Sequence, residues 1–263
     1  MNDVPKFFIV SDVHSHYRPL KRALEEKGFD PNNEDHWLIS CGDLFDRGND
    51  SEEVFLYIMS LPRKILVKGN HDILLEELCT RGFPYSHDGH NGTVRTVNDI
   101  GGAGFGRPFD ECCEVTYNKM ARYRELLVNY FETQNYIFVH SWVPTIVECN
   151  GTSKPWYQVG KTHSYKEDWR NATDSEWEEA MWGNPFWKAQ DGLNQTGKTI
   201  VFGHWHCSLG HLCDSDGELT EFGEDAIWEP YINKHQGIIG IDRCTAHTGE
   251  VNVLVIEDGF LGN

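Results

Sequence analysis

Five short polar segments, each following an apolar run, constrain the fold of this 263-residue chain more than any other feature. The apolar runs have the length of β-strands and end near residues 10, 40, 67, 139 and 202. In open α/β sheets, ligands bind beyond the carboxyl ends of the strands, so residues that follow different strands can meet at one point. We expect this convergence for Asp12-Val13-His14, Gly42 to Gly48, Gly69 to Asp72, Val139-His140 and Gly203 to His206.

Strand and helix patterns alternate from Phe7 to about Thr80, which predicts an α/β fold with a parallel sheet and right-handed crossovers. The next segment, Arg81 to Gly106, is rich in Gly, His, Asn and Asp, and we expect a long irregular excursion there. A helix is predicted from Asn118 to Phe131. Near the carboxyl end, Gly237 to Ile241 and Val251 to Ile256 are expected to form a hairpin that closes a second, mixed sheet.

The length of the chain is compatible with a single domain over residues 1–263 that carries an insertion at about 144–197. Long loops are usually either disordered or functional, and the many aromatic residues of this insertion argue against disorder. Two interpretations stay open: a lid or wall over the site, or a satellite core that buries the aromatic rings. The residues concerned are Trp156, Tyr157, Trp169, Trp177, Trp182, Phe186 and Trp187.

The formal net charge of -18 argues against nucleic acid or an anionic membrane as the main partner. Phosphorylated small molecules, nucleotides and phosphoproteins remain compatible as substrates, because two divalent cations can reverse the potential locally. The sequence shows no amino-terminal signal pattern and no apolar stretch approaching the roughly 18 residues of a spanning helix. We therefore expect a cytoplasmic protein with no membrane partner.

Eight cysteines, without a C-x-x-C pair or regular spacing, are expected to be reduced thiols. An alternative use for two of them is a structural zinc site, since histidine and thiolate are normal zinc ligands. Such a site would compete for two histidines with the metal centre described next. Its candidate ligands are His204, His206, Cys207, His211 and Cys213.

The polar segments supply two ligand sets for divalent metal ions, because carboxylate, amide and imidazole groups suit such ions and Asp43 can bridge two of them. One ion is assigned to Asp12, His14, Asp43 and His206. The other is assigned to Asp43, Asn70, His140 and His204. Two such ions would polarise a phosphoryl oxygen and generate a hydroxide between them for in-line attack.

Three further residues complete the predicted chemistry. His71 is assigned as the proton donor to the leaving oxygen, since imidazole has a suitable pKa near neutrality. Asp46 would orient that imidazole, and Arg47 would clamp phosphate oxygens with its planar fork of donors. Each segment alone has an ordinary explanation as a surface pair, a turn or a core histidine. Their conjunction at strand ends is what favours a metal site.

The order D-x-H, G-D-x-x-D-R-G, G-N-H-D, V-H and G-H-x-H resembles that of the calcineurin-like metallophosphoesterases. The ending Asp46-Arg47-Gly48 is similar to the branch that holds phosphoprotein phosphatases, bacteriophage lambda phosphatase and symmetrical diadenosine tetraphosphatases. The resemblance runs from residue 6 to about 257 and is poor from Pro144 to Gly197. It implies a four-layer αββα sandwich of two mixed sheets, with two divalent ions at the strand ends; manganese is the first choice, then iron or zinc.

By the same resemblance, His71 and Asp46 match the family's proton donor and orienting carboxylate, and Arg47 matches a phosphate clamp. The matching metal ligands are Asp12, His14, Asp43, Asn70, His140 and His204. Lambda-type and eukaryotic phosphatases have a second phosphate-binding arginine, and Asn184 is expected in its place here. His206 is extra relative to that branch and typical of the broader superfamily, whose substrates include diesters and cyclic nucleotides.

Three functional hypotheses follow. The first is a metal-dependent phosphoesterase acting on phosphomonoesters, including phosphoserine or phosphothreonine in proteins. The second keeps the chemistry but hydrolyses dinucleoside tetraphosphates or other phosphodiesters, with aromatic residues such as Trp156 and Trp182 stacking on a base. The third is a non-catalytic metal-binding module that recruits partners through its aromatic segment.

Overall fold

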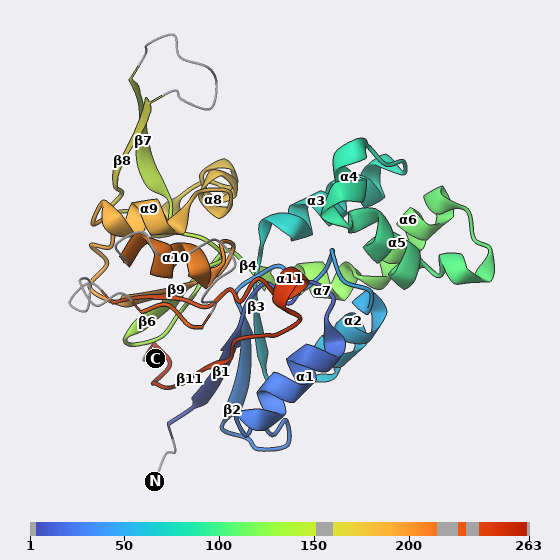
Figure 1. Ribbon diagram of the computed structural model, residues 1–263, viewed down its shortest axis with the longest axis horizontal. Coiled ribbons are helices and arrows are strands. Elements are labelled where there is room, and N and C mark those ends of the chain that lie inside the picture. Colours follow the sequence, from blue (N-terminus) through green and yellow to red (C-terminus); the bar gives the residue numbers. More distant parts are fainter. Residues whose placement is uncertain (1–3, 151–159, 215–225, 230–236, 262–263) are drawn as a thin grey trace.

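Two mixed β-sheets pack face to face, and helices cover the outer face of each sheet (Figure 1). This four-layer αββα arrangement is that of a computed structural model, which describes residues 4–150, 160–214, 226–229 and 237–261. The α/β class and the two mixed sheets predicted from the sequence are confirmed.

The first sheet has the strand order β11-β1-β2-β3-β4, and its neighbours are parallel except for the antiparallel pair of β11 and β1. Helices α1 (Tyr17–Glu26) and α2 (Ser51–Ser60) connect β1, β2 and β3, as the alternating pattern predicts. Helix α3 (Asn70–Arg81) follows β3 directly. The strands are β1 (Lys6–Val10), β2 (His36–Ser40), β3 (Lys64–Val67), β4 (Leu127–Val128) and β11 (Leu254–Glu257).

The second sheet has the order β10-β9-β6-β5, in which only β5 and β6 are antiparallel. Its strands are β5 (Phe131–Glu132), β6 (Tyr136–Phe138), β9 (Thr199–Phe202) and β10 (Ile238–Gly240). Helices α8 (Asp174–Met181), α9 (Pro185–Gln190) and α10 (Cys207–Asp214) lie on its outer side (Figure 1).

Alternation of side chains along the strands divides the apolar residues among three cores. In β1, Phe8 and Val10 pack under the helices of the first sheet, whereas Phe7 and Ile9 pack between the two sheets. Strand β9 alternates in the same way. Val201 packs between the sheets, whereas Ile200 and Phe202 pack in the core of the second helical layer. Because both faces of these strands are buried, their sequences are nearly continuous runs of apolar residues.

The segment Arg81 to Gly106, expected to be irregular, is mostly helical, so that prediction was wrong. It contains α4 (Ser86–Asn91), α5 (Thr93–Gly101) and the 3-10 turn η1 (Ala103–Phe105). Gly92 ends α4 in a left-handed conformation with φ of 85° and starts α5. The buried face of α5 includes threonines as well as apolar residues, which hides its helical periodicity: Thr93, Thr96, Val97 and Ile100.

The helix predicted from Asn118 to Phe131 is also misplaced. Helix α6 (Phe109–Lys119) begins earlier, and the short α7 (Ala121–Leu126) follows it. The chain then becomes extended, because Leu127 and Val128 pair with Leu66 and Val67 at the edge of the first sheet. Long-range pairing here overrides the local helical pattern.

The predicted hairpin of Gly237–Ile241 and Val251–Ile256 does not form. Strand β10 pairs with β9 in the second sheet, while β11 pairs with β1 in the first. The short helix α11 (Thr245–Thr248) lies between them in sequence, and the chain passes from one sheet to the other. Both runs find partners distant in sequence, which local turn signals do not reveal.

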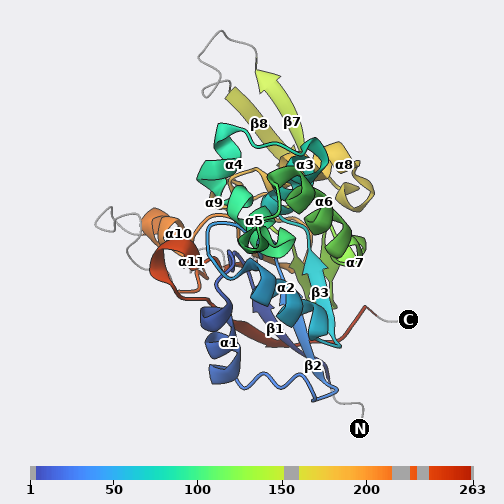
Figure 2. The ribbon, with the colours of Figure 1, turned by 90° about the vertical axis from the view of Figure 1, so that its right-hand side faces the viewer.

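The insertion at 144–197 contains regular elements, and part of it packs into the core of the second helical layer. Strands β7 (Thr145–Asn150) and β8 (Gly160–Tyr165) form an antiparallel pair that extends away from the sheets (Figures 1 and 2). Trp169, Trp177 and Phe186 are buried as the second interpretation expects, but they share one core with residues of β6 and β9 and do not form a separate satellite core. Trp182 and Trp187 are exposed by 48% and 64% of their surface, so they remain available at the surface.

Two further expectations concern two aromatic residues of the insertion and membrane-spanning helices. Residues Trp156 and Tyr157 lie outside the described residues. Among the described residues, none of the helices combines the length and the apolar character needed to cross a membrane.

An ion-pair cluster around Glu132 fixes strand β5 to the insertion. Arg170, in the 3-10 turn η3 (Trp169–Asn171), places Nη2 2.6 Å from Glu132 Oε1, and Lys198 Nζ lies 2.8 Å from the same oxygen. Burial alone would raise the pKa of Glu132, but the hydrogen bonds from Arg170 and Lys198 outweigh it and lower the pKa.

We expect Glu132→Gln, which keeps the volume but removes the charge, to lower the free energy of unfolding at neutral pH by about 1 to 3 kcal/mol. Since the pKa of Glu132 is lowered on folding, its stabilisation is present above the ordinary glutamate pKa and is lost as pH falls through the lowered value. Urea unfolding from neutral to acidic pH should show the difference shrinking. A difference that stays constant with pH would contradict the ionic origin.

Candidate metal centre

Sharp turns after the strands hold the predicted site residues in left-handed backbone conformations. For residues other than glycine, such conformations cost of order 1–3 kcal/mol and persist only where the surrounding structure enforces them. Asp12 follows β1 with φ of 50°, and Asp43 follows β2 with φ of 53°. Apart from Cys244, the described residues of this kind lie in or beside the polar segments: Asp12, His14, Ser15, Asp43, Asp46, Arg47 and His204.

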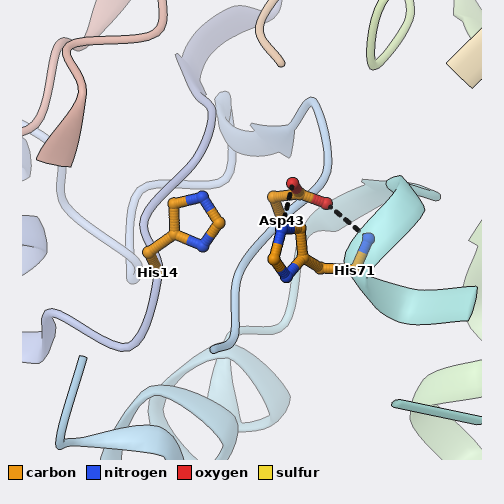
Figure 3. Close-up of side chains that lie close together, drawn as sticks. All are labelled: His14, Asp43 and His71. Atoms are coloured by element: carbon orange, nitrogen blue, oxygen red, sulfur yellow. Dashed lines mark hydrogen bonds and ion pairs between the residues drawn. The ribbon is translucent and has the colours of Figure 1, made fainter. Parts of the chain in front are cut away.

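His14, Asp43 and His71 form one group that could hold a metal ion, since one potential ligand atom of each lies within 4.8 Å of the others. They come from the turns after β1 and β2 and from the first turn of α3 (Figure 3). The His71 backbone N–H donates to Asp43 Oδ1 at 3.1 Å. His14 Nδ1 donates to the Phe45 carbonyl at 2.9 Å, which leaves Nε2 as its ligand atom.

Asp43, His140 and His204 form a second group that could hold a metal ion. His140 Nδ1 donates to the Cys41 carbonyl at 2.8 Å, and its Nε2 lies 2.8 Å from Asn70 Oδ1 and 3.1 Å from His204 Nδ1. Asp43 Oδ2 is 3.5 Å from His140 Nε2. Asp43 therefore belongs to both groups, which is the position a bridging carboxylate needs.

Asp12 links the two sheets at this site. Its Oδ2 accepts hydrogen bonds from Ser11 Oγ at 2.5 Å and from the His204 backbone N–H at 2.8 Å, and its Oδ1 lies 3.8 Å from His14 Nε2. Position 203 must be glycine, because a Cβ there would overlap both the Ser11 hydroxyl and the Asp12 carboxylate.

The predicted proton donor has its partners in place. His71 Nδ1 donates to Asp46 Oδ2 at 2.7 Å, and Arg47 Nη2 lies 3.4 Å from His71 Nε2. His71 and Asp46 are buried, whereas Arg47 is exposed, so its guanidinium can meet an incoming anion. Because His71 also belongs to the first metal-type group, its Nε2 could serve as a third ligand instead of a proton donor.

Burial and neighbouring charges set the pKa values of these groups. Burial opposes ionisation of Asp43, but the surrounding imidazoles, His140 foremost, outweigh it and lower the pKa. Burial raises the pKa of Asp12 to about 6. Burial, and then His140, lowers the pKa of His204 to about 3, and burial likewise lowers that of His14. Near neutrality Asp43 is thus a carboxylate, while His14 and His204 are neutral rings, which is the state in which they bind metal.

The donor set fits divalent cations. Asp12 and Asp242 are both buried, and within the described part of the chain neither has a lysine or arginine in ion-pair contact. Burial and the charge of Asp12 raise the pKa of Asp242 well above its usual value. Two cations would supply the positive charge that these carboxylates lack, at a place where neutral imidazole nitrogens converge.

His206, which the sequence analysis assigns to the first ion, stays a predicted ligand. It is half-buried, and its Nδ1 is 2.5 Å from Ser208 Oγ at the start of α10. It belongs to neither group of potential ligands found among the described residues. Asp12 also stands outside both groups, although it lies directly beside His14.

The alternative zinc site does not assemble from its described members. The Cys207 thiol donates to the Gly240 carbonyl, and His211 Nε2 lies 3.0 Å from the Ala226 carbonyl. Among the described residues, neither joins a group of potential metal ligands. The side chain of Cys213 lies outside the described residues.

Asn184 has a capping role in the structure. It is the N-cap of α9, and its Oδ1 accepts hydrogen bonds from the backbone N–H groups of Phe186 and Trp187. The ring of Trp182, two residues earlier, lies edge-to-face with that of His204 at a centroid distance of 6.5 Å. The ring centroid of Trp187, in α9, lies 6.4 Å from that of Trp205.

The residues that fix the site side chains through hydrogen bonds were not identified in the sequence analysis. Thr93 and Thr96 of α5 donate to Asp46, and Tyr123 of α7 donates to Asp72 Oδ1 at 2.8 Å. Asp72 in turn accepts from the Gly69 N–H at 2.8 Å and so fixes the turn that leads into Asn70. The spacing of Asp72, three residues after Gly69, is a helix N-terminus signal that could have identified this capping role.

Gly69→Ala tests the tight packing behind the two ligand groups. A Cβ at position 69 would overlap Asp43 Oδ1, so we expect Mn²⁺ affinity to fall by about tenfold or more, as for other losses of ligand orientation. Titration calorimetry with folded protein measures this. Gly89→Ala on α4 is the control, since a Cβ there meets no atom within 4 Å. Equal affinity of the two variants would contradict the packing argument.

Comparison with known proteins agrees with this geometry. The curated relatives include a symmetrical bis(5'-nucleosyl)-tetraphosphatase of Proteus mirabilis (strain HI4320), 44% identical over 69 residues, which are 26% of this chain and 24% of that protein. One from Legionella pneumophila (strain Corby) is 38% identical over 91 residues, which are 34% of this chain and 32% of that protein. The matches thus span only about a quarter to a third of these relatives.

A similar fold is found in the crystal structure of a cold-active protein-tyrosine phosphatase of a psychrophilic Shewanella species. The TM-score is 0.52 at 15% sequence identity, with 98% of this chain and 78% of that chain covered. The profile of one family, described as calcineurin-like phosphoesterase, matches residues 5–248. Together with two ligand groups that share Asp43 at the strand ends, this match shows that the chain belongs to the calcineurin-like phosphoesterase family and is a hydrolase.

Proposed function

We propose that the protein hydrolyses phosphomonoesters, including phosphoserine or phosphothreonine in proteins, with two divalent cations of which manganese is the first choice. The observation that carries this proposal is the placement of His71, Asp46 and Arg47 beside a carboxylate shared by two ligand groups. The free thiols of the six described cysteines support a cytoplasmic location, where thiols stay reduced.

We assign a different step of the reaction to each set of side chains. His14, Asp43, Asn70, His140 and His204 would hold the cations, with Asp12 beside them; when bound, such cations neutralise phosphate charge and activate a water nucleophile. Arg47, exposed at the edge of the site, would bind phosphate oxygens and orient the phosphorus atom. His71 would donate a proton to the leaving oxygen. Its pKa, which burial alone would lower, is raised by the charge of Asp43 and the hydrogen bond to Asp46.

Asp43→Asn tests this proposal, because it removes the charge shared by both ligand groups while keeping the side-chain shape. We expect manganese-loaded wild-type protein to hydrolyse p-nitrophenyl phosphate and phosphopeptides, and the variant to lose at least about a hundredfold in rate. Steady-state kinetics measures the effect. Wild-type turnover no faster than that of the variant would contradict the proposal.

A second candidate, hydrolysis of dinucleoside tetraphosphates, is favoured by the names of the curated relatives and by the aromatic rings at the site. Trp182 is 48% exposed and contacts the ring of His204, so a base could stack on it while the phosphates lie at the metal centre.

Trp182→Ala separates the two substrate classes. Stacking on a base contributes roughly 1 to 3 kcal/mol, so we expect kcat/KM for diadenosine tetraphosphate to fall about fivefold to a hundredfold while that for p-nitrophenyl phosphate stays unchanged. Phe105→Ala is the matched control, because Phe105 is an aromatic residue 94% exposed on η1. Parallel losses on both substrates, or faster turnover of phosphopeptide than of diadenosine tetraphosphate, would count against this candidate.

A further inference from the structure

Helix α5 holds the carboxylate that orients the proton donor. Thr93 Oγ1 donates to Asp46 Oδ2 at 2.7 Å, and Thr96 Oγ1 donates to Asp46 Oδ1 at 2.7 Å. His71 Nδ1 donates to Oδ2 as well. Both oxygens of Asp46 are therefore bound, and all three residues around the carboxylate are at most 3% exposed.

The direction of the Thr96 hydroxyl is fixed by its other partners. Its oxygen accepts from the Asp46 backbone N–H at 3.0 Å and from Ser51 Oγ at 3.3 Å, so its own hydrogen points to Asp46 Oδ1. Ser51 Oγ lies 2.8 Å from Ser15 Oγ, in the turn that carries His14. The hydroxyls thus connect α5 and α2 to the first polar segment.

The same helix also holds the loop that carries Arg47. Arg95 Nη1 donates to the Arg47 carbonyl at 2.7 Å, and the Asp99 carboxylate accepts from the Glu52 N–H at 2.9 Å. Gly92 packs directly on the Arg47 backbone, where a Cβ would overlap the Arg47 nitrogen. Helix α5 therefore forms a rigid backing for the segment from Asp46 to Glu52.

We propose that Thr93 and Thr96 are positioning residues, which fix the plane of Asp46 and thereby aim the His71 ring at the leaving oxygen. The inference rests on the proposed function, since it assumes that His71 donates that proton. Without the two hydroxyls the carboxylate could rotate about its side-chain bond, and the ring bound to it would lose its fixed orientation. The bond between phosphorus and the leaving oxygen breaks as the proton passes from His71 Nε2 to that oxygen, while the oxygen of a water molecule forms the new bond to phosphorus and releases a proton to solvent. His71 regains a proton from solvent before the next turnover.

Leaving groups of different quality test this role. A good leaving group such as p-nitrophenolate needs little proton donation, whereas phenolate or an alkoxide depends on it. We expect Thr93→Val and Thr96→Val to lower kcat for phenyl phosphate at least about tenfold more than kcat for p-nitrophenyl phosphate. Thr96→Ser, which keeps the hydroxyl, should keep the wild-type ratio of kcat for phenyl phosphate to kcat for p-nitrophenyl phosphate. In a His71→Asn background, Thr96→Val should leave the ratio unchanged.

Thr116→Val is the matched control, because Thr116 is a buried threonine of α6 whose hydroxyl donates to the Val97 carbonyl of α5. Thr116→Val should leave the ratio of kcat for phenyl phosphate to kcat for p-nitrophenyl phosphate at the wild-type value. If valine at 93 or 96 prevents folding, the Thr→Ala variants give the same comparison. Equal losses on both substrates, or a changed ratio in Thr116→Val, would overturn the inference alone. No turnover of either substrate by the wild-type protein would instead contradict the proposed function.

Discussion

The carboxylate of Asp43 lies between two groups of imidazoles, and the arrangement of the whole site depends on it. Asp43 is only 2% exposed, and the neighbouring imidazoles, His140 foremost, outweigh the effect of burial and lower its pKa. Burying a charge costs several kcal/mol unless opposite charge or hydrogen bonds compensate for it. A buried carboxylate with the neutral rings of His14 and His204 beside it is an arrangement that bound cations stabilise.

The two sheets bring these groups together from opposite sides. The first sheet supplies the turns that carry His14, Asp43 and Asn70, and the second supplies those that carry His140 and His204. The core between the sheets sets their separation and hence the distance between the ligand turns. Strained turns can persist because the strand ends that lead into them are buried and the strands pair over most of their length, so the strain is offset by packing elsewhere.

The strand ends could be predicted from sequence because apolar runs and sharp polar turns are local signals. Asp43 and His140 follow such runs, and the structure brings them within 3.5 Å of each other. Helix α5 could not be predicted in the same way, since Thr93 and Thr96 face Asp46 and so replace apolar residues on its buried side. Strands β4 and β11 depend on partners far along the chain, which periodicity does not identify.

Anomalous diffraction from crystals soaked with Mn²⁺ tests the central claim most directly. The account predicts two manganese peaks, one beside His14 and Asp43 and the other beside Asp43, His140 and His204. An absence of peaks at Asp43, or a single peak bound to ligands that exclude it, would contradict the claim.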